Sequence, residues 1–70
     1  MNIKKIKRYL FTKLGVNIVI LYYGSRNKKE KYCGILYRLY NNVFTVRLLN
    51  GEIKCFSYAD ILIKNVQIYV

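Results

Sequence analysis

The chain has 70 residues, with thirteen Lys and Arg against three Asp and Glu, so its formal net charge is +10 at pH 7. This length predicts a single domain over residues 1–70 and leaves no room for a second one. Because the chain has no histidine and few carboxylates, general bases and metal ligands are scarce, and we expect neither catalysis nor a metal or cofactor.

Residues 2–14 are predicted to form a short amphipathic helix. An apolar stripe recurs at helical spacing: Ile3, Ile6, Leu10, Phe11 and Leu14. The opposite face is polar and mostly basic: Lys4, Lys5, Arg8 and Thr12. Asn2 is a suitable N-cap, and Gly15 suits the position that follows a helix. The basic face is compatible both with plain solvation and with phosphate contact.

From residue 16 onward, β-branched and aromatic residues dominate and predict five strands. Their expected ranges are 16–23, 31–40, 43–49, 52–56 and 65–70. Residues 24–29 form a polar, basic loop, and the pairs Asn41-Asn42 and Asn50-Gly51 predict tight turns. Alternation along the second strand places one set of side chains on one face: Cys33, Ile35, Tyr37 and Leu39. It places the other set on the opposite face: Tyr32, Leu36, Arg38 and Tyr40.

The segment Ser57-Tyr58-Ala59-Asp60 fits a capping box at the start of a short helical turn. The Ser57 hydroxyl and the Asp60 carboxylate are each expected to accept a backbone amide. Tyr58 is expected to be a core aromatic beneath this turn, and Gly34 to permit the close approach of a neighbouring strand. We expect five short strands, with one helical turn before the last, to curl into a small barrel. The sequence therefore predicts a mainly β fold.

One stretch, residues 56–62 (Phe-Ser-Tyr-Ala-Asp-Ile-Leu), resembles the Veg family, small bacterial proteins described as stimulators of biofilm formation. Further matches are Gly34-Ile35-Leu36, Tyr40 and Val43-Phe44, with Gly24, Arg26 and Lys28 in the first loop. The resemblance runs from about residue 14 to the C-terminus. It implies an SH3-like small barrel preceded by a helix, and a role in controlling gene expression. The hairpin at Asn50-Gly51 is shorter than is usual in the family, and Arg38 and Arg47 make this member unusually cationic.

Cysteine usage and hydropathy favour a cytoplasmic protein. Cys33 and Cys55 lack CxxC spacing, and we expect both to be reduced, half-buried strand residues. The longest apolar run, residues 18–23, is far shorter than the roughly 20 residues that span a bilayer. A basic start is also found in signal peptides, but Lys13 and Asn17 interrupt any apolar core here. We therefore expect no membrane partner.

The charge favours a polyanionic partner, because like charges on so small a domain repel one another and nucleic acid relieves that repulsion. Codon drift toward A and T is an alternative source of the lysines. It does not readily explain the shortage of Asp and Glu, whose codons are also rich in A.

The candidate nucleic-acid-binding residues lie in and around the first loop. The loop cations are Arg26, Lys28, Lys29 and Lys31, to which the helix adds Lys4, Lys5 and Arg8. Tyr22, Tyr23 and Tyr32 flank the loop, where they either stack on unpaired bases or simply pack within their strands. The residues with structural roles are Gly34, Ser57, Tyr58 and Asp60.

These features favour a non-catalytic nucleic-acid-binding module. RNA is preferred to duplex DNA because no helix-turn-helix recognition helix is visible, and ribosomal RNA or ribosomal proteins are the expected partners. The alternative is an adaptor that binds a transcriptional regulator through a strand edge at residues 66–69, an aromatic groove or an outward face. That outward face comprises Val43, Thr45, Arg47 and Leu49. Membrane-surface binding by the basic helix is a third option. The oligomeric state is left open.

Overall fold

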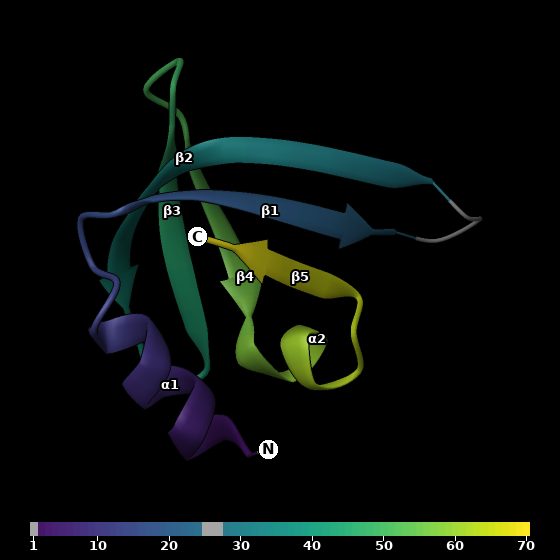
Figure 1. The fold of residues 1–70 in the computed structure, drawn as a ribbon. Coiled ribbons are helices and arrows are strands. Elements are labelled where there is room, and N and C mark those ends of the chain that lie inside the picture. The colour runs from purple at the N-terminus through teal and green to yellow at the C-terminus, as the bar shows by residue number, and fades with distance from the viewer. Residues whose placement is uncertain (1, 25–27) are drawn as a thin grey trace.

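The computed structural model describes residues 2–24 and 28–70 and shows one antiparallel five-stranded sheet with two helices. The elements in chain order are α1 (Ile3–Phe11), β1 (Asn17–Tyr23), β2 (Lys29–Leu39), β3 (Val43–Leu48), β4 (Ile53–Ser57), α2 (Tyr58–Leu62) and β5 (Val66–Tyr69) (Figure 1). The strand order is β4-β3-β2-β1-β5. This confirms the predicted mainly β fold and is consistent with an SH3-like barrel. Within the described residues, no helix has the length and apolar character needed to cross a bilayer.

Helix α1 begins as predicted but ends three residues early. The Asn2 side-chain carbonyl accepts a hydrogen bond from the Lys5 amide at 2.9 Å, which confirms the N-cap. Phe11 was expected in the apolar stripe, yet it is 68% exposed. The reason is helical geometry: Phe11 lies three residues after Arg8 and seven after Lys4, so it shares their side of the helix. Only Ile6 and Leu10 of α1 are buried.

The core lies between the inner face of the sheet and the two helices. Its buried members come from every element: Ile6, Leu10, Ile18, Ile20, Leu36, Phe44, Val46, Phe56, Tyr58 and Val66. Strand β1 pairs with both β2 and β5, and it buries Ile18 and Ile20 on the inner face. Gly34 in β2 pairs with Ile18 on one side and Leu48 on the other. A Cβ at Gly34 would meet the Arg47 carbonyl oxygen at 2.3 Å, so the expected close strand approach is confirmed.

A β-bulge in β2 reverses the alternation that the sequence predicted. Leu36 pairs with Val46, but Arg38 pairs with Thr45, which leaves one extra residue on β2. The Thr45 hydroxyl accepts the Arg38 amide at 3.1 Å and donates to the Arg38 carbonyl at 3.3 Å. Beyond the bulge, Leu39 packs against the core. The predictions that Leu39 shares a face with Cys33 and Arg38 a face with Leu36 are therefore wrong.

The two cysteines are free and exposed, where half-buried positions were expected. Cys33 alternates with the inward residues Tyr32 and Gly34 and so lies on the outer face of β2. Cys55 lies beside Phe56 on β4, an edge strand of the sheet. The Cys33 thiol is open to solvent because no helix of the described residues covers the outer face of β2. The Cys55 thiol is open to solvent because β4 is at the edge of the sheet.

Only half of the predicted capping box forms at α2. The Ser57 hydroxyl oxygen accepts the Ala59 amide at 3.0 Å, as expected of an N-cap. Among the described residues, no hydrogen bond joins the Asp60 carboxylate to the Ser57 amide. The reciprocal bond normally uses Glu or Gln, and Asp is one methylene shorter. Asp60 instead accepts the Asn65 amide at 2.9 Å through its backbone carbonyl.

Tyr58, the predicted core aromatic, is fully buried and stacks on Phe44 with ring centroids 5.7 Å apart. Its hydroxyl donates to the Tyr40 carbonyl at 2.8 Å, and burial raises the pKa of Tyr58. Tyr58→Phe is therefore expected to cost about 1–2 kcal/mol in urea unfolding at neutral pH, because the buried bond is lost.

Alkaline pH provides a second readout of Tyr58. A raised pKa in the folded state favours the neutral phenol, so its contribution is fully present below about pH 10 and is lost as pH rises further. The wild-type chain should then lose more stability above this pH than Tyr58→Phe does. Tyr69→Phe removes an exposed hydroxyl that bonds Gln67 and is the matched control, expected to change stability by less than about 0.5 kcal/mol. Equal losses in both variants would contradict the role given to Tyr58.

Candidate nucleic-acid interface

The β1–β2 hairpin presents lysines on its outer face. Lys29 pairs with Tyr23 and Lys31 with Leu21, while the buried Ile20 pairs with Tyr32 on the inner face. Lys29 and Lys31 are two residues apart and exposed, so both point outward. Lys28 is exposed just before the strand. The remaining predicted loop cation, Arg26, lies outside the described residues.

The predicted stacking tyrosines lie on opposite faces of this hairpin. Tyr23 is on the outer face, where the Lys29 ammonium lies 5.3 Å from its ring centroid, within cation–π range. Tyr32 is on the inner face and donates a hydrogen bond to the Glu30 carboxylate. Tyr23 thus lies on the same face as Lys29 and Lys31, and Tyr32 lies on the opposite face.

Two arginines extend the row of outward cations along the sheet. Arg47 pairs with Ile35, which shares the outer face of β2 with Lys29 and Lys31. Arg38, beyond the bulge, pairs with Thr45, which lies two residues from Arg47 on β3. The Arg38 guanidinium lies 5.2 Å from the Tyr37 ring centroid. We call this surface the outer cationic face: Lys29, Lys31, Arg38 and Arg47, together with the exposed Lys28 that immediately precedes β2.

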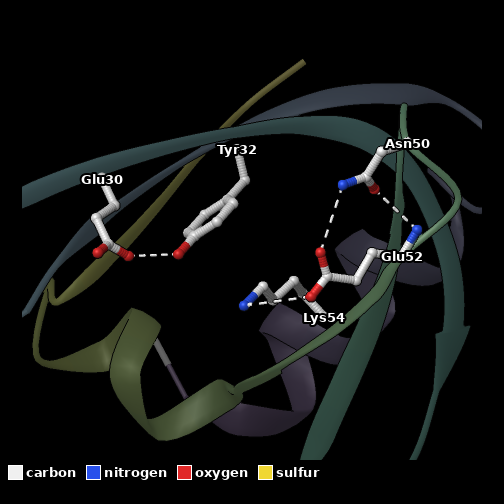
Figure 2. A network of polar contacts seen from close by, with 5 residues as sticks. All are labelled: Glu30, Tyr32, Asn50, Glu52 and Lys54. Carbon is white, nitrogen blue, oxygen red and sulfur yellow. Dashed lines mark hydrogen bonds and ion pairs between the residues drawn. The ribbon is translucent and has the colours of Figure 1, made fainter.

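The carboxylates are on the other side of the sheet, and Figure 2 shows two of them, Glu30 and Glu52. Glu30 points inward to the Tyr32 hydroxyl, and this hydrogen bond, followed by burial, raises the pKa of Tyr32. Glu52 lies 3.8 Å from the Lys54 ammonium and accepts a hydrogen bond from the Asn50 side chain. Asp60 is on α2, near the inward Tyr22 and Tyr32. No carboxylate of the described residues shares the outer cationic face.

The helix cations lie far from the loop cations. Lys4, Lys5 and Arg8 are exposed on α1. The segment after α1 is fixed to the far half of β2, where the Gly15 amide donates to the Leu36 carbonyl at 2.9 Å. The length of β1 separates this point from Lys29, which pairs with Tyr23 at the other end of the strand (Figure 1). The structure therefore does not bring the helix cations and the loop cations together.

Arg38 and Arg47 were not among the residues predicted for nucleic-acid binding, although Arg47 belonged to the outward face of the adaptor alternative. Their grouping with Lys29 and Lys31 depends on the β2–β3 register and on the bulge, neither of which is visible in a period-two pattern. Lys29 and Lys31 were predictable, because their spacing alone places them on one face of a strand.

Comparison with known proteins supports the sequence resemblance. The family model described as the biofilm formation stimulator Veg matches residues 1–69. The match includes α1, which lies before the residues on which the resemblance was based. A comparison with individually curated proteins finds no match.

Proposed function

The chain belongs to the Veg family of biofilm formation stimulators, and on that premise we propose that it is a non-catalytic module that binds RNA. The outer cationic face is the proposed interface. The observation that carries the proposal is the separation of charge, with exposed cations along β2 and β3 and the carboxylates on the opposite side. A phosphate chain on this face would be attracted throughout its length.

Single-stranded or looped RNA fits this surface better than duplex DNA. In the part of the chain that the structure describes, both helices are packed into the fold: α1 buries Ile6 and Leu10, and α2 buries Tyr58. Neither is placed to enter a major groove. The outer face offers rings beside cations instead, with Tyr23 under Lys29 and Tyr37 under Arg38, and such rings stack on unpaired bases. We propose ribosomal RNA in the cytoplasm as the target, with gene expression as the process affected.

The salt dependence of RNA binding tests this proposal. If the five residues of the outer cationic face each neutralise a phosphate, log K for a single strand should fall with log salt at a slope near −3.5. A fourfold rise in salt should then weaken binding about a hundredfold. Fluorescence anisotropy of a labelled single-stranded RNA measures the slope. On the proposed target, we expect the protein to sediment with ribosomal particles at low salt and to be released from them at high salt. A slope near zero contradicts the proposal.

A protein adaptor is the second candidate. The observation that favours it is the pair of open edges at β4 and β5, since an extended segment of another protein can add to an edge strand. An apolar groove of about 390 Å³ between α1 and β5 lies beside one of these edges. An adaptor would keep its protein contact when the lysines of the hairpin are reversed, whereas RNA retention would be lost.

A further inference from the structure

A cleft of about 350 Å³ lies on the side of the molecule that bears the carboxylates. Tyr22 and Tyr32 line it from the inner face of the hairpin, and Phe56 lines it from β4. The ring centroids of Tyr22 and Tyr32 are 6.3 Å and 5.8 Å from that of Phe56. This volume is near the lower end of the roughly 300–1,000 Å³ that ligand pockets occupy, so the cleft suits one side chain or a group of similar size.

Carboxylates outnumber cations around the cleft, when the residues that contact its lining are counted with the lining itself. Asp60 lines it directly. Glu30 and Glu52 do not line the cleft, but each contacts a residue that does: Glu30 accepts a hydrogen bond from Tyr32, and Glu52 pairs with Lys54 (Figure 2). In a chain with a net charge of +10, each of the three Asp and Glu side chains therefore lines this aromatic cleft or contacts a residue that lines it. Such a site disfavours phosphate and favours a cation.

One cation already contacts the aromatic wall. Lys54 lines the cleft, and its ammonium lies 5.5 Å from the Tyr32 ring centroid, within the range of a cation–π interaction. The Glu52 carboxylate lies 3.8 Å from the same ammonium. An aromatic face with a carboxylate beside it is the environment that an arginine or lysine from outside would require. Lys54 would compete with the incoming side chain for the Tyr32 ring and the Glu52 carboxylate.

We propose that this cleft binds an arginine or lysine side chain from an extended segment of a partner protein. The neighbouring β4 is an edge strand, so its backbone groups are available to the segment that carries the cation. The aromatic rings and carboxylates supply contacts for the cation, and the edge supplies contacts for the backbone. This site is independent of the proposed RNA interface, which lies on the other face of the sheet.

Titration of the full ¹⁵N-labelled chain with a short capped peptide carrying one central arginine tests the proposal. We expect saturable amide shifts centred on Tyr22, Tyr32 and Asp60, with a dissociation constant on the order of 1 mM or tighter. The same peptide with neutral citrulline should bind at least about tenfold more weakly. Because the chain has a net charge of +10, nonspecific attraction would instead favour an anionic peptide. Absence of shifts at the cleft, or equal binding of both peptides, would overturn the proposal.

Substitutions in the cleft should change affinity in opposite directions. Asp60→Asn with Glu30→Gln keeps the shapes but removes charge, and should weaken the arginine peptide about tenfold. Lys54→Gln removes the competing cation and should tighten binding about threefold. Lys13→Gln is the matched control, because the Lys13 ammonium lies 5.6 Å from the Tyr9 ring centroid, outside the cleft, and affinity should be unchanged.

The signs of these changes also distinguish a protein partner from RNA in the cleft. If the cleft bound RNA, Lys54→Gln would weaken binding of a single-stranded RNA and the carboxylate substitutions would strengthen it. That result would overturn the present proposal while leaving RNA binding itself intact. Failure of RNA binding by the outer cationic face, with arginine binding preserved, would overturn only the proposed function.

Discussion

Reversal of Lys29 and Lys31 to Glu is expected to weaken RNA binding by between about tenfold and a hundredfold at ~0.15 M salt. The loss of two phosphate contacts accounts for about the lower value, and the repulsion from two new carboxylates adds the rest. The slope of log K against log salt should become shallower by about 1.4 for a single-stranded RNA. Both quantities follow from anisotropy titrations of wild-type and variant chains with one labelled RNA.

The control for this variant is the same charge change at another place. Lys4→Glu with Lys5→Glu alters the exposed face of α1, which the structure separates from the hairpin. Both double variants lower the net charge by four, so any effect of overall charge is shared. We expect less than about a threefold loss for the helix variant, since distant surface charges are largely screened at this salt. Equal losses in the two variants would mean that binding senses net charge and not the outer cationic face.

Local patterns in the sequence predicted most of the fold. The apolar–polar alternation located every strand to within two residues, and the Asn50-Gly51 pair marked the turn before β4, where Gly51 has φ of +88°. Two of the predictions that failed concern the strand faces beyond the bulge and the burial of Phe11. The bulge involves the Thr45 hydroxyl of the neighbouring strand, which no local pattern contains. Phe11 is exposed because it lies on the same side of α1 as Lys4 and Arg8.

The candidate sites were less predictable than the fold. Spacing within one strand identified Lys29 and Lys31, because it needs no knowledge of pairing. The addition of Arg38 and Arg47 requires the β2–β3 register. The grouping of the carboxylates requires β2, the turn before β4 and α2 to meet around one cleft. Only tertiary contacts place these groups together.

Gly34→Ala is expected to destabilise the chain by about 3 kcal/mol or more. The added Cβ would lie 2.3 Å from the Arg47 carbonyl oxygen and 3.0 Å from the Leu48 Cα, both backbone atoms of the adjoining strand. The backbone of a paired strand cannot rotate away as a side chain can. The strands β2 and β3 would therefore have to separate near Leu36 and Val46, which pair with each other and belong to the core. Domains of this size have only a few kcal/mol of stability, so the variant should be largely unfolded at 37 °C.

Gly24→Ala is the matched control for Gly34→Ala, because it makes the same chemical change where space exists. Its new Cβ would meet the Tyr22 ring edge at 3.4 Å, an ordinary van der Waals contact with a side chain. We expect urea unfolding, followed by circular dichroism, to show a change of less than about 1 kcal/mol for this control. Since neither glycine has a positive φ, backbone conformation does not distinguish the two positions. A similar small loss of stability in both variants would show that β2 and β3 can move apart at little cost. Close packing at Gly34 would then not be what maintains the β2–β3 register on which the outer cationic face depends.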